Sequence, residues 1–417
     1  MSAGSTGAPS PWTTTPAMPH MEPRIAADTH SVPTSDAVRY AARVPEAIAA
    51  PKVLLGLTGL QIDGGIAVVN RCVARVMDEQ TRAGAVERVD RVLLLEEAGA
   101  GTPAPARGED HLSHGSQPRF VWQLWRSYRR QRPRLVFLDQ VGLARSLLLP
   151  LPGFPPPGSA IFAHGIELTA ARQGHRARAL SQARVLLANS EMTGQQLRSE
   201  HPELANRVRV VQLCIDPVRT ESWEAAGPVP PSHEREPAAL IVGRMWSEER
   251  GKGHDHLLEA WPDVRRRVPA AQLWIVGGGD DAERLKRKAG EIGIADSVHM
   301  LGRVSDEELS ELYRRASLFA MPSRQEGFGL VYAEAMWHGL PCIASNADAA
   351  GEVIRDGESG ELDPYGDVSA LSASLISMLS EGERQQTLAA AAQRRARERF
   401  TYPRFRRDLL QALEMTD

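Results

Sequence analysis

The sequence predicts an α/β protein with two domains, each a parallel sheet covered by helices. The first observation is an apolar run, 53–57, that leads into a glycine-rich turn and then a helical pattern, which is how a doubly wound domain opens. The second observation is that the same order starts again at 238–243. The third is a polar, proline-rich stretch at 217–237, which is typical of a linker between domains.

Strand candidates recur along both halves and alternate with helical segments or loops. In the first half we expect strands at 53–57, 91–95, 135–138, 160–163, 185–188 and 208–212. In the second half we expect them at 238–243, 272–276, 297–301, 317–321 and 341–344. This alternation predicts a Rossmann-like plan for each half. Two such domains facing each other place a ligand in the cleft between the carboxyl ends of their sheets.

This plan divides the chain into five parts. We expect a disordered tail, an N-terminal domain, a linker, a C-terminal domain and a closing helix, at 1–50, 51–220, 221–237, 238–395 and 396–417. Seven prolines among Ser, Thr and Ala favour disorder in the tail. The tail also lacks the basic start and apolar centre of a secretory signal.

Composition excludes several classes of protein. The net charge is −3, which argues against a general nucleic-acid binder. The three cysteines are few and far apart in the chain, so we expect no disulfide framework and a reducing, cytoplasmic location. No apolar run reaches the roughly 18–20 residues that span a bilayer.

Two motifs of the second half favour a bound diphosphate or nucleotide. Arg244 leaves a strand and Lys252 precedes a helix expected to start near 254, so both cations can converge on one anion. The turn at Gly277 formally fits GxGxxA. A nicotinamide dinucleotide also needs an acidic residue about 20 residues on, and the next strand, 298–302, ends without one. A turn that lets another nucleotide approach closely is the favoured interpretation, and a turn that serves packing alone is the alternative.

The third motif contains a pair of glutamates. Glu326 lies in a glycine-flanked loop after a strand, and Glu334 lies about one turn into the next helix. Loop N–H groups and the helix N-terminus would face an anion, with a carboxylate on each side. Carboxylates repel a phosphate but suit the hydroxyls of sugars attached to it.

The motifs in this order resemble the retaining nucleotide-sugar glycosyltransferases of family 4, which have the GT-B fold. They are Val-Gly-Arg at 242–244, Lys-Gly at 252–253, Glu-Gly-Phe-Gly-Leu at 326–330, Glu-Ala-Met at 334–336 and Gly-Glu-Leu at 360–362. First-half matches are Asp63-Gly-Gly65, the His-Gly motif at 163–167 and Asn-Ser with Thr193 at 188–193. The closing segment is similar to the family's helix that crosses back to the N-terminal domain.

The resemblance implies roles residue by residue. Arg244 and Lys252 would neutralise the departing diphosphate, and Glu326 would hold the donor sugar. Glu334 would bind the ribose, and His164 would face the donor sugar and the acceptor. The remaining donor contacts would come from Gly64, Gly65, Gly277, Arg303, Val304, Phe328, Gly329 and Leu330.

These roles imply the transfer of a hexosyl unit, in polysaccharide or glycolipid synthesis. The donor would be a nucleotide-diphosphate sugar of the GDP-mannose or UDP-glucose type, and the acceptor a saccharide or a lipid-linked saccharide. The chain has no DxD motif, so we expect no metal and no other cofactor, and Asp280-Asp281 are expected to cap a helix. The departing phosphate would take the acceptor proton, and double displacement through Glu326 is the lower-ranked alternative.

Three other functions stay open from the residues. A GT-B sugar-nucleotide epimerase would bind the same donor, an NAD enzyme would use the Gly277 turn, and a binding protein could have lost its activity. Two departures from the family pattern also stand out. Cys214 replaces a common glycine, where we expect a small buried thiol, and 349–352 is a reduced Gly-Gly-x-x-Glu stretch.

One segment of the first domain concerns location. Residues 119–134 hold six arginines among four aromatic residues and are predicted to form a basic amphipathic helix. Such a helix can lie on an anionic membrane at the inner face of the cell membrane. The alternative is a helix that covers the sheet with a solvated basic face.

Overall fold

The computed structural model of the protein describes residues 50–415, apart from 63, 98–102, 149–157, 166 and 169–173. The predicted tail therefore lies outside the described residues, except for its last position. Residues 49–417 form one compact unit.

Among the described residues, the first sheet has seven parallel strands in the order β3-β2-β1-β4-β5-β6-β7. The strands are β1 Lys52–Leu57, β2 Arg88–Leu93, β3 Asp110–Leu112, β4 Leu135–Leu138, β5 Ser159–Ala163, β6 Val185–Ala188 and β7 Val208–Val210. Its helices are α1 Gly65–Arg82, α2 Gln117–Gln131, α3 Gly174–Ser181 and α4 Glu191–Glu200. The central strands β1, β4, β5 and β6 are apolar and buried nearly throughout, as expected for a sheet covered on both faces.

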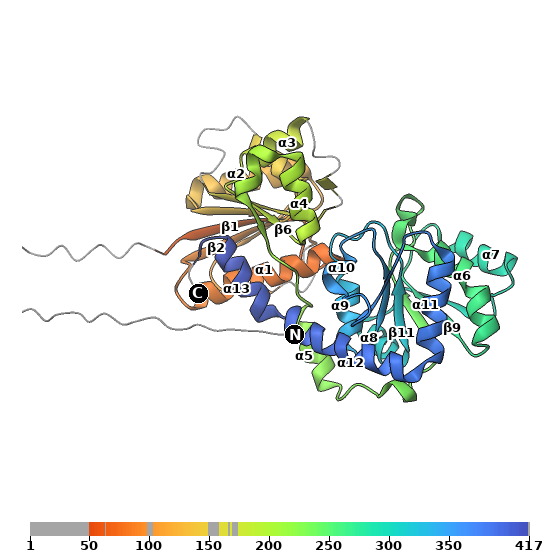
Figure 1. Ribbon diagram of the computed structural model, residues 1–417. Coiled ribbons are helices and arrows are strands. Elements are labelled where there is room, and N and C mark those ends of the chain that lie inside the picture. Colours follow the sequence, from red (N-terminus) through yellow and green to blue (C-terminus); the bar gives the residue numbers. More distant parts are fainter. Residues whose placement is uncertain are drawn as a thin grey trace, which may run out of the picture. The chain divides into compact units, whose positions relative to one another are not determined.

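The described part of the second half forms a six-stranded parallel sheet in the order β10-β9-β8-β11-β12-β13. The strands are β8 Ala238–Val242, β9 Gln272–Val276, β10 Val298–Gly302, β11 Leu318–Met321, β12 Cys342–Ser345 and β13 Gly360–Asp363. Its helices are α6 His254–Arg267, α7 Ala282–Glu291, α8 Asp306–Arg315, α9 Leu330–Trp337, α10 Ala350–Val353 and α11 Val368–Ser380. Figure 1 shows α6 and α11 side by side against this sheet.

Three elements were not expected from the sequence, and β2, at Arg88–Leu93, is shifted from the expected 91–95. Two short polar edge strands, β3 and β13, were not predicted because they contain no apolar run. An ion pair between Arg91 and Asp110, 2.6 Å apart, joins β3 to β2. Helix α5, Pro217–Ala225, occupies part of the stretch where we expected irregular chain. Pro217 stands at its first turn, where proline is tolerated, and Asp216 caps it. The linker limits of 221–237 stay a prediction.

The closing segment returns to the first domain, as predicted. Helix α12, Gly382–Arg399, packs on α9, and α13, Tyr402–Ala412, lies beside α1 (Figure 1). Arg406 of α13 pairs with Glu79 of α1 at 3.2 Å. Between the two helices, the Phe400 carbonyl accepts the N–H of Ile215 at 3.1 Å.

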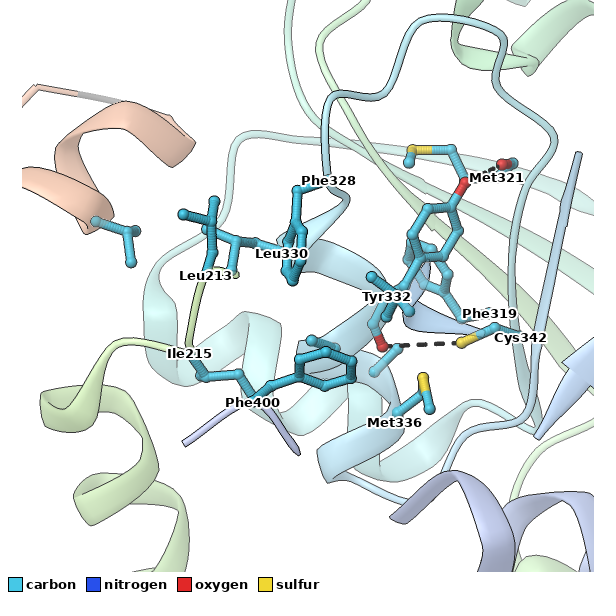
Figure 2. Close-up of a cluster of buried hydrophobic side chains, with 14 of the residues drawn as sticks. Leu213, Ile215, Phe319, Met321, Phe328, Leu330, Tyr332, Met336, Cys342 and Phe400 are labelled. Carbon is cyan, nitrogen blue, oxygen red and sulfur yellow. Dashed lines mark hydrogen bonds between the residues drawn. The ribbon is translucent and has the colours of Figure 1, made fainter. Parts of the chain in front are cut away.

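An apolar cluster continues from the second sheet to this crossover. Figure 2 shows Leu213, Ile215 and Phe400 grouped with Phe328 and Leu330 of the glutamate-bearing loop. The rings of Phe328 and Phe400 meet edge to face, with centroids 5.8 Å apart. The predicted site loop is therefore anchored by its apolar side chains.

Candidate functional site

The two residues expected to handle the donor sugar and diphosphate form an ion pair. Lys252 Nζ lies 2.5 Å from Glu326 Oε2, and both side chains are mostly buried. Lys252 ends the segment before α6, which starts at His254 as predicted. The loop of Glu326 follows β11. Both therefore stand at the carboxyl ends of strands in one parallel sheet, where ligands of such sheets bind.

The loops that carry this pair are packed tightly. The Arg324 N–H donates to the Gly251 carbonyl at 2.9 Å. Gly253 has a φ of +92°, and a Cβ there would meet the Pro322 carbonyl at 2.6 Å. Only glycine fits at this close approach.

Glycines bring the neighbouring strand ends together. Gly277 has a φ of +133°, and a Cβ there would lie 2.0 Å from the Gly243 carbonyl. The Met245 N–H donates to the Gly278 carbonyl at 2.9 Å, so the turns after β8 and β9 are joined. The Arg303 side chain, after β10, lies 3.4 Å from the position of a Cβ on Gly278, beside the glycine turn, and its contact with the donor stays a prediction. Val304 follows it and packs partly buried against the core.

Arg244 does not join the ion pair of Lys252 and Glu326. Its side chain is 61% exposed, and it binds Glu249 at 3.0 Å. A diphosphate would have to draw Arg244 away from this carboxylate. The structure therefore brings Lys252 and Glu326 together and leaves Arg244 on the rim of the same strand ends.

The Glu326 loop presents backbone N–H groups at a helix start. Gly329 precedes α9 with a φ of +92°, and no side chain caps the helix there. A Cβ on Gly329 would meet Tyr332 at 2.4 Å. The N–H groups of Phe328, Gly329 and Leu330, which we expected to hold sugar and phosphate, lie at this N-terminus, where the helix dipole favours negative charge.

Asp348, which the sequence analysis did not single out, holds the same loop from β12's side. Its Oδ2 accepts the Glu326 N–H at 2.9 Å, and its Oδ1 accepts the Ala350 N–H at 3.0 Å. Burial raises the pKa of Asp348 to about 6. Only the two N–H groups bound in the folded structure reveal this role, because no sequence motif marks an aspartate 22 residues from Glu326.

Glu334 lies where we expected, one turn into α9, but it is buried and engaged. Arg219 Nη1 donates to its Oε1 at 2.7 Å, and the Tyr313 hydroxyl donates to its Oε2 at 3.3 Å. Burial raises the pKa of Glu334, and the charge of Arg219 opposes that effect. Its predicted contact with a ribose stays a prediction.

His164 belongs to the first domain, and its backbone lies against the Glu326 loop. A Cβ on Gly327 would lie 1.9 Å from the His164 carbonyl oxygen, so these two backbones touch. His164 Nε2 lies 2.7 Å from the Asp139 carbonyl, which can only accept, so this nitrogen carries the proton. The Asn189 amide donates to the His164 carbonyl at 3.2 Å. The histidine is thus fixed beside the Glu326 loop.

The glycine loop of the first domain also lies near α9. Gly64 has a φ of +112°, and a Cβ on Gly65 would lie 3.8 Å from Leu330. Asp63, the first residue of the predicted motif, lies outside the described residues. The two halves therefore approach each other at Gly65 and Leu330 as well as at His164 and Gly327.

Two further expectations can be compared with the structure. Asp281 stands at the N-cap of α7, as expected, but its side chain makes no capping hydrogen bond; Arg250 and Arg284 donate to its carboxylate, and Ser247 donates to Asp280. Cys214 is a buried thiol as expected, and its Sγ lies 3.6 Å from that of Cys72, beyond the roughly 2.05 Å of a disulfide. Across the described ranges, no three His, Cys, Asp or Glu side chains gather as a metal-binding group.

The predicted basic helix at 119–134 is α2. Phe120 and Tyr128 are buried, whereas Trp122 is 51% exposed. Exposed arginines share the outer face with Trp122, at Arg119, Arg126, Arg129 and Arg130. None of the helices in the described residues combines the length and apolar character needed to cross a bilayer.

Comparison with solved structures defines the class of fold. The chain superposes on HepE of Anabaena, solved with UDP and glucose, with a TM-score of 0.68 and 18% identity, covering 88% of this chain and 100% of HepE. It superposes on the sucrose-phosphate synthase of Thermosynechococcus elongatus with a TM-score of 0.66 and 20% identity, covering 87% and 98% of the two chains. The fold is GT-B, as predicted.

Comparison of sequences then shows which known proteins part of the chain is similar to. Residues 225–395 match the family described as "Glycosyl transferases group 1". A GDP-mannose-dependent alpha-(1-6)-phosphatidylinositol monomannoside mannosyltransferase of Mycolicibacterium smegmatis is 37% identical over 34% of this chain and 38% of its own length. The phosphatidyl-myo-inositol mannosyltransferase of Mycobacterium leprae is 39% identical over 37% and 40%. The chain thus spans about two fifths of the length of each of these relatives.

Proposed function

We propose that the protein is a retaining glycosyltransferase that moves a hexosyl unit from a nucleotide-diphosphate sugar to a saccharide or a lipid-linked acceptor. The observation that carries the proposal is the pair of Lys252 and Glu326, 2.5 Å apart at the strand ends of a domain that matches glycosyl transferases group 1. A cation and a carboxylate held side by side suit a diphosphate and the hydroxyls of the sugar joined to it.

Charge separation explains the proposed chemistry. As the bond to the sugar breaks, negative charge grows on the diphosphate and positive charge on the sugar. Lys252, Arg244 and the N–H groups before α9 would stabilise the diphosphate, and one such preorganised donor is worth about 2.7–4 kcal/mol. With two cations available, we propose that the reaction needs no metal. The leaving phosphate oxygen would take the acceptor proton on the same face, which retains the anomeric configuration.

Among donors, we propose GDP-mannose first and UDP-glucose second. Two of the relatives that align with this chain are named as a GDP-mannose-dependent enzyme and a mannosyltransferase. Their names also contain phosphatidylinositol, which favours a lipid-linked acceptor and a role in glycolipid synthesis.

The character of the outer face of α2 agrees with a lipid-linked acceptor, because this face suits contact with a membrane. Trp122 is exposed beside the guanidinium of Arg126, which lies 5.2 Å from its ring centroid. An exposed tryptophan among arginines suits the boundary between headgroups and acyl chains of an anionic bilayer. We propose that the protein acts in the cytoplasm and binds the inner face of the membrane through 119–134. Sedimentation with vesicles of phosphatidylglycerol should fall for Arg126→Ala/Arg129→Ala, and unchanged binding would contradict this contact.

The activity is tested by product analysis with purified protein, GDP-mannose or UDP-glucose, and a panel of lipid and saccharide acceptors. We expect a glycosylated product, unaffected by EDTA, and a loss of at least 100-fold in rate for Lys252→Ala and Glu326→Ala. The rate loss in Lys252→Ala is compared with that in variants of Arg303, a neighbouring cation. Conversion of the sugar nucleotide without an acceptor would indicate an epimerase instead, and near-normal turnover in both variants would place the site elsewhere.

A further inference from the structure

Arg219 makes the best-defined contact with Glu334, and neither the motifs nor the comparisons single it out. It is the third residue of α5, and its Nη1 donates to Glu334 Oε1 at 2.7 Å. Its Nε donates to Asp306 Oδ2 at 3.1 Å. The guanidinium is therefore clamped between α8 and α9, and its side chain is only 21% exposed.

The environment of Glu334 explains why such a partner is required. The residues of α9 around it are apolar and buried, and the Glu334 side chain is itself about 5% exposed. An unpaired carboxylate there would be costly, and an apolar residue would pack at least as well. A buried carboxylate paired with an arginine is thus more than packing requires.

The hydrogen-bonding capacity of the carboxylate is only partly used. Each carboxylate can accept about four hydrogen bonds. Arg219 takes one position on Oε1, and the Tyr313 hydroxyl takes one on Oε2 through a long contact of 3.3 Å. The remaining lone pairs suit two adjacent hydroxyl groups, such as those of a ribose.

We infer that Arg219 is a positioning residue that keeps Glu334 ionised and oriented to accept hydrogen bonds from the ribose hydroxyls of the donor nucleotide. The inference rests on the proposed function, which supplies the nucleotide. Arg219 touches neither sugar nor phosphate in this account; it acts through Glu334. Tyr313 fixes the second carboxylate oxygen from α8.

The test measures the preference for ribose over 2′-deoxyribose. Dissociation constants are compared for GDP and 2′-deoxy-GDP, and for UDP and 2′-deoxy-UDP, by titration calorimetry on the full chain. A hydrogen bond to a charged group is strong enough that we expect the wild-type protein to prefer the ribose form about tenfold or more. Arg219→Ala should lower this ratio to near one while binding of the 2′-deoxy form changes little.

Two variants separate positioning from general damage. Arg219→Lys keeps the charge without the planar fork and should restore part of the ratio, which also covers the case in which Arg219→Ala fails to fold. Arg91→Ala removes a comparable buried pair with Asp110 at the far sheet edge and should leave the ratio unchanged.

Failure of the inference and failure of the proposed function give different results. An unchanged ribose preference in Arg219→Ala and Arg219→Lys would overturn the inference alone. Absence of binding of both GDP and UDP to the wild-type protein would overturn the proposed function and the inference with it.

Discussion

Replacing Gly327 with alanine tests whether the two domains meet at the site. The new Cβ would lie 1.9 Å from the His164 carbonyl oxygen and 3.2 Å from the Asn189 amide nitrogen. Ordinary contacts of Cβ begin near 3.4 Å, so the two loops must separate by more than 1 Å. A misplacement of about 1 Å costs on the order of 100-fold in rate.

We therefore expect kcat/KM of Gly327→Ala for hexosyl transfer to fall about 100-fold. The cores of both sheets are untouched, so the far-ultraviolet circular dichroism and the cooperativity of unfolding should match the wild type. Gly290→Ala is the matched control, since a Cβ there meets nothing within 4 Å and Gly290 lies inside helix α7. It should keep full activity and gain about 0.5–1 kcal/mol in stability. Full activity in Gly327→Ala would refute the reasoning.

Three further predictions concern stability. Burial raises the pKa of Asp348 to about 6 from 3.8, so between these pH values the folded state binds a proton that the unfolded state has lost. The free energy of unfolding should therefore fall as the pH rises from about 4 to 6, and this residue should contribute at most about 3 kcal/mol to the fall. Asp348→Asn should lose that part of the slope in urea unfolding at several pH values; an identical slope would contradict the assignment. The Glu352 carboxylate accepts the N–H groups of Glu191 and Met192 at 2.7 and 2.8 Å, so Glu352→Ala should cost about 1 kcal/mol, whereas the exposed control Glu358→Ala should cost nothing measurable. The buried hydroxyl of Tyr332 donates to the Met321 carbonyl at 2.5 Å (Figure 2), so Tyr332→Phe should lower the free energy of unfolding by about 1–2 kcal/mol, and no change would show that the bond adds nothing.

The fold could be predicted because its signals are local. An apolar run followed by glycine and a helical pattern lies within about 20 residues, and it recurs at 53–65 and 238–254. The edge strands β3 and β13 carry no such signal, because their stability comes from pairing with β2 and β12. Helix α5 was not predicted because the polar, proline-rich stretch at 217–237 is typical of a linker, whereas at the first turn of a helix Pro217 replaces an N–H that has no partner there.

The candidate site was predicted in part for the same reason. Lys252 and Glu326 each follow a strand of one parallel sheet, so their meeting at one edge could be expected from the pattern alone. The partner of Glu334 lies 115 residues away on another element, and no spacing rule connects it to Arg219. The bonds of Glu352 to the start of α4 span 160 residues or more and depend on how the chain folds back.

A crystal structure of the protein with bound GDP would test the central claim most directly. The account predicts that the diphosphate lies within hydrogen-bond distance of Lys252 Nζ and the N–H groups before α9, with the ribose hydroxyls on Glu334. A diphosphate bound away from Lys252, with the ion pair to Glu326 intact, would contradict it.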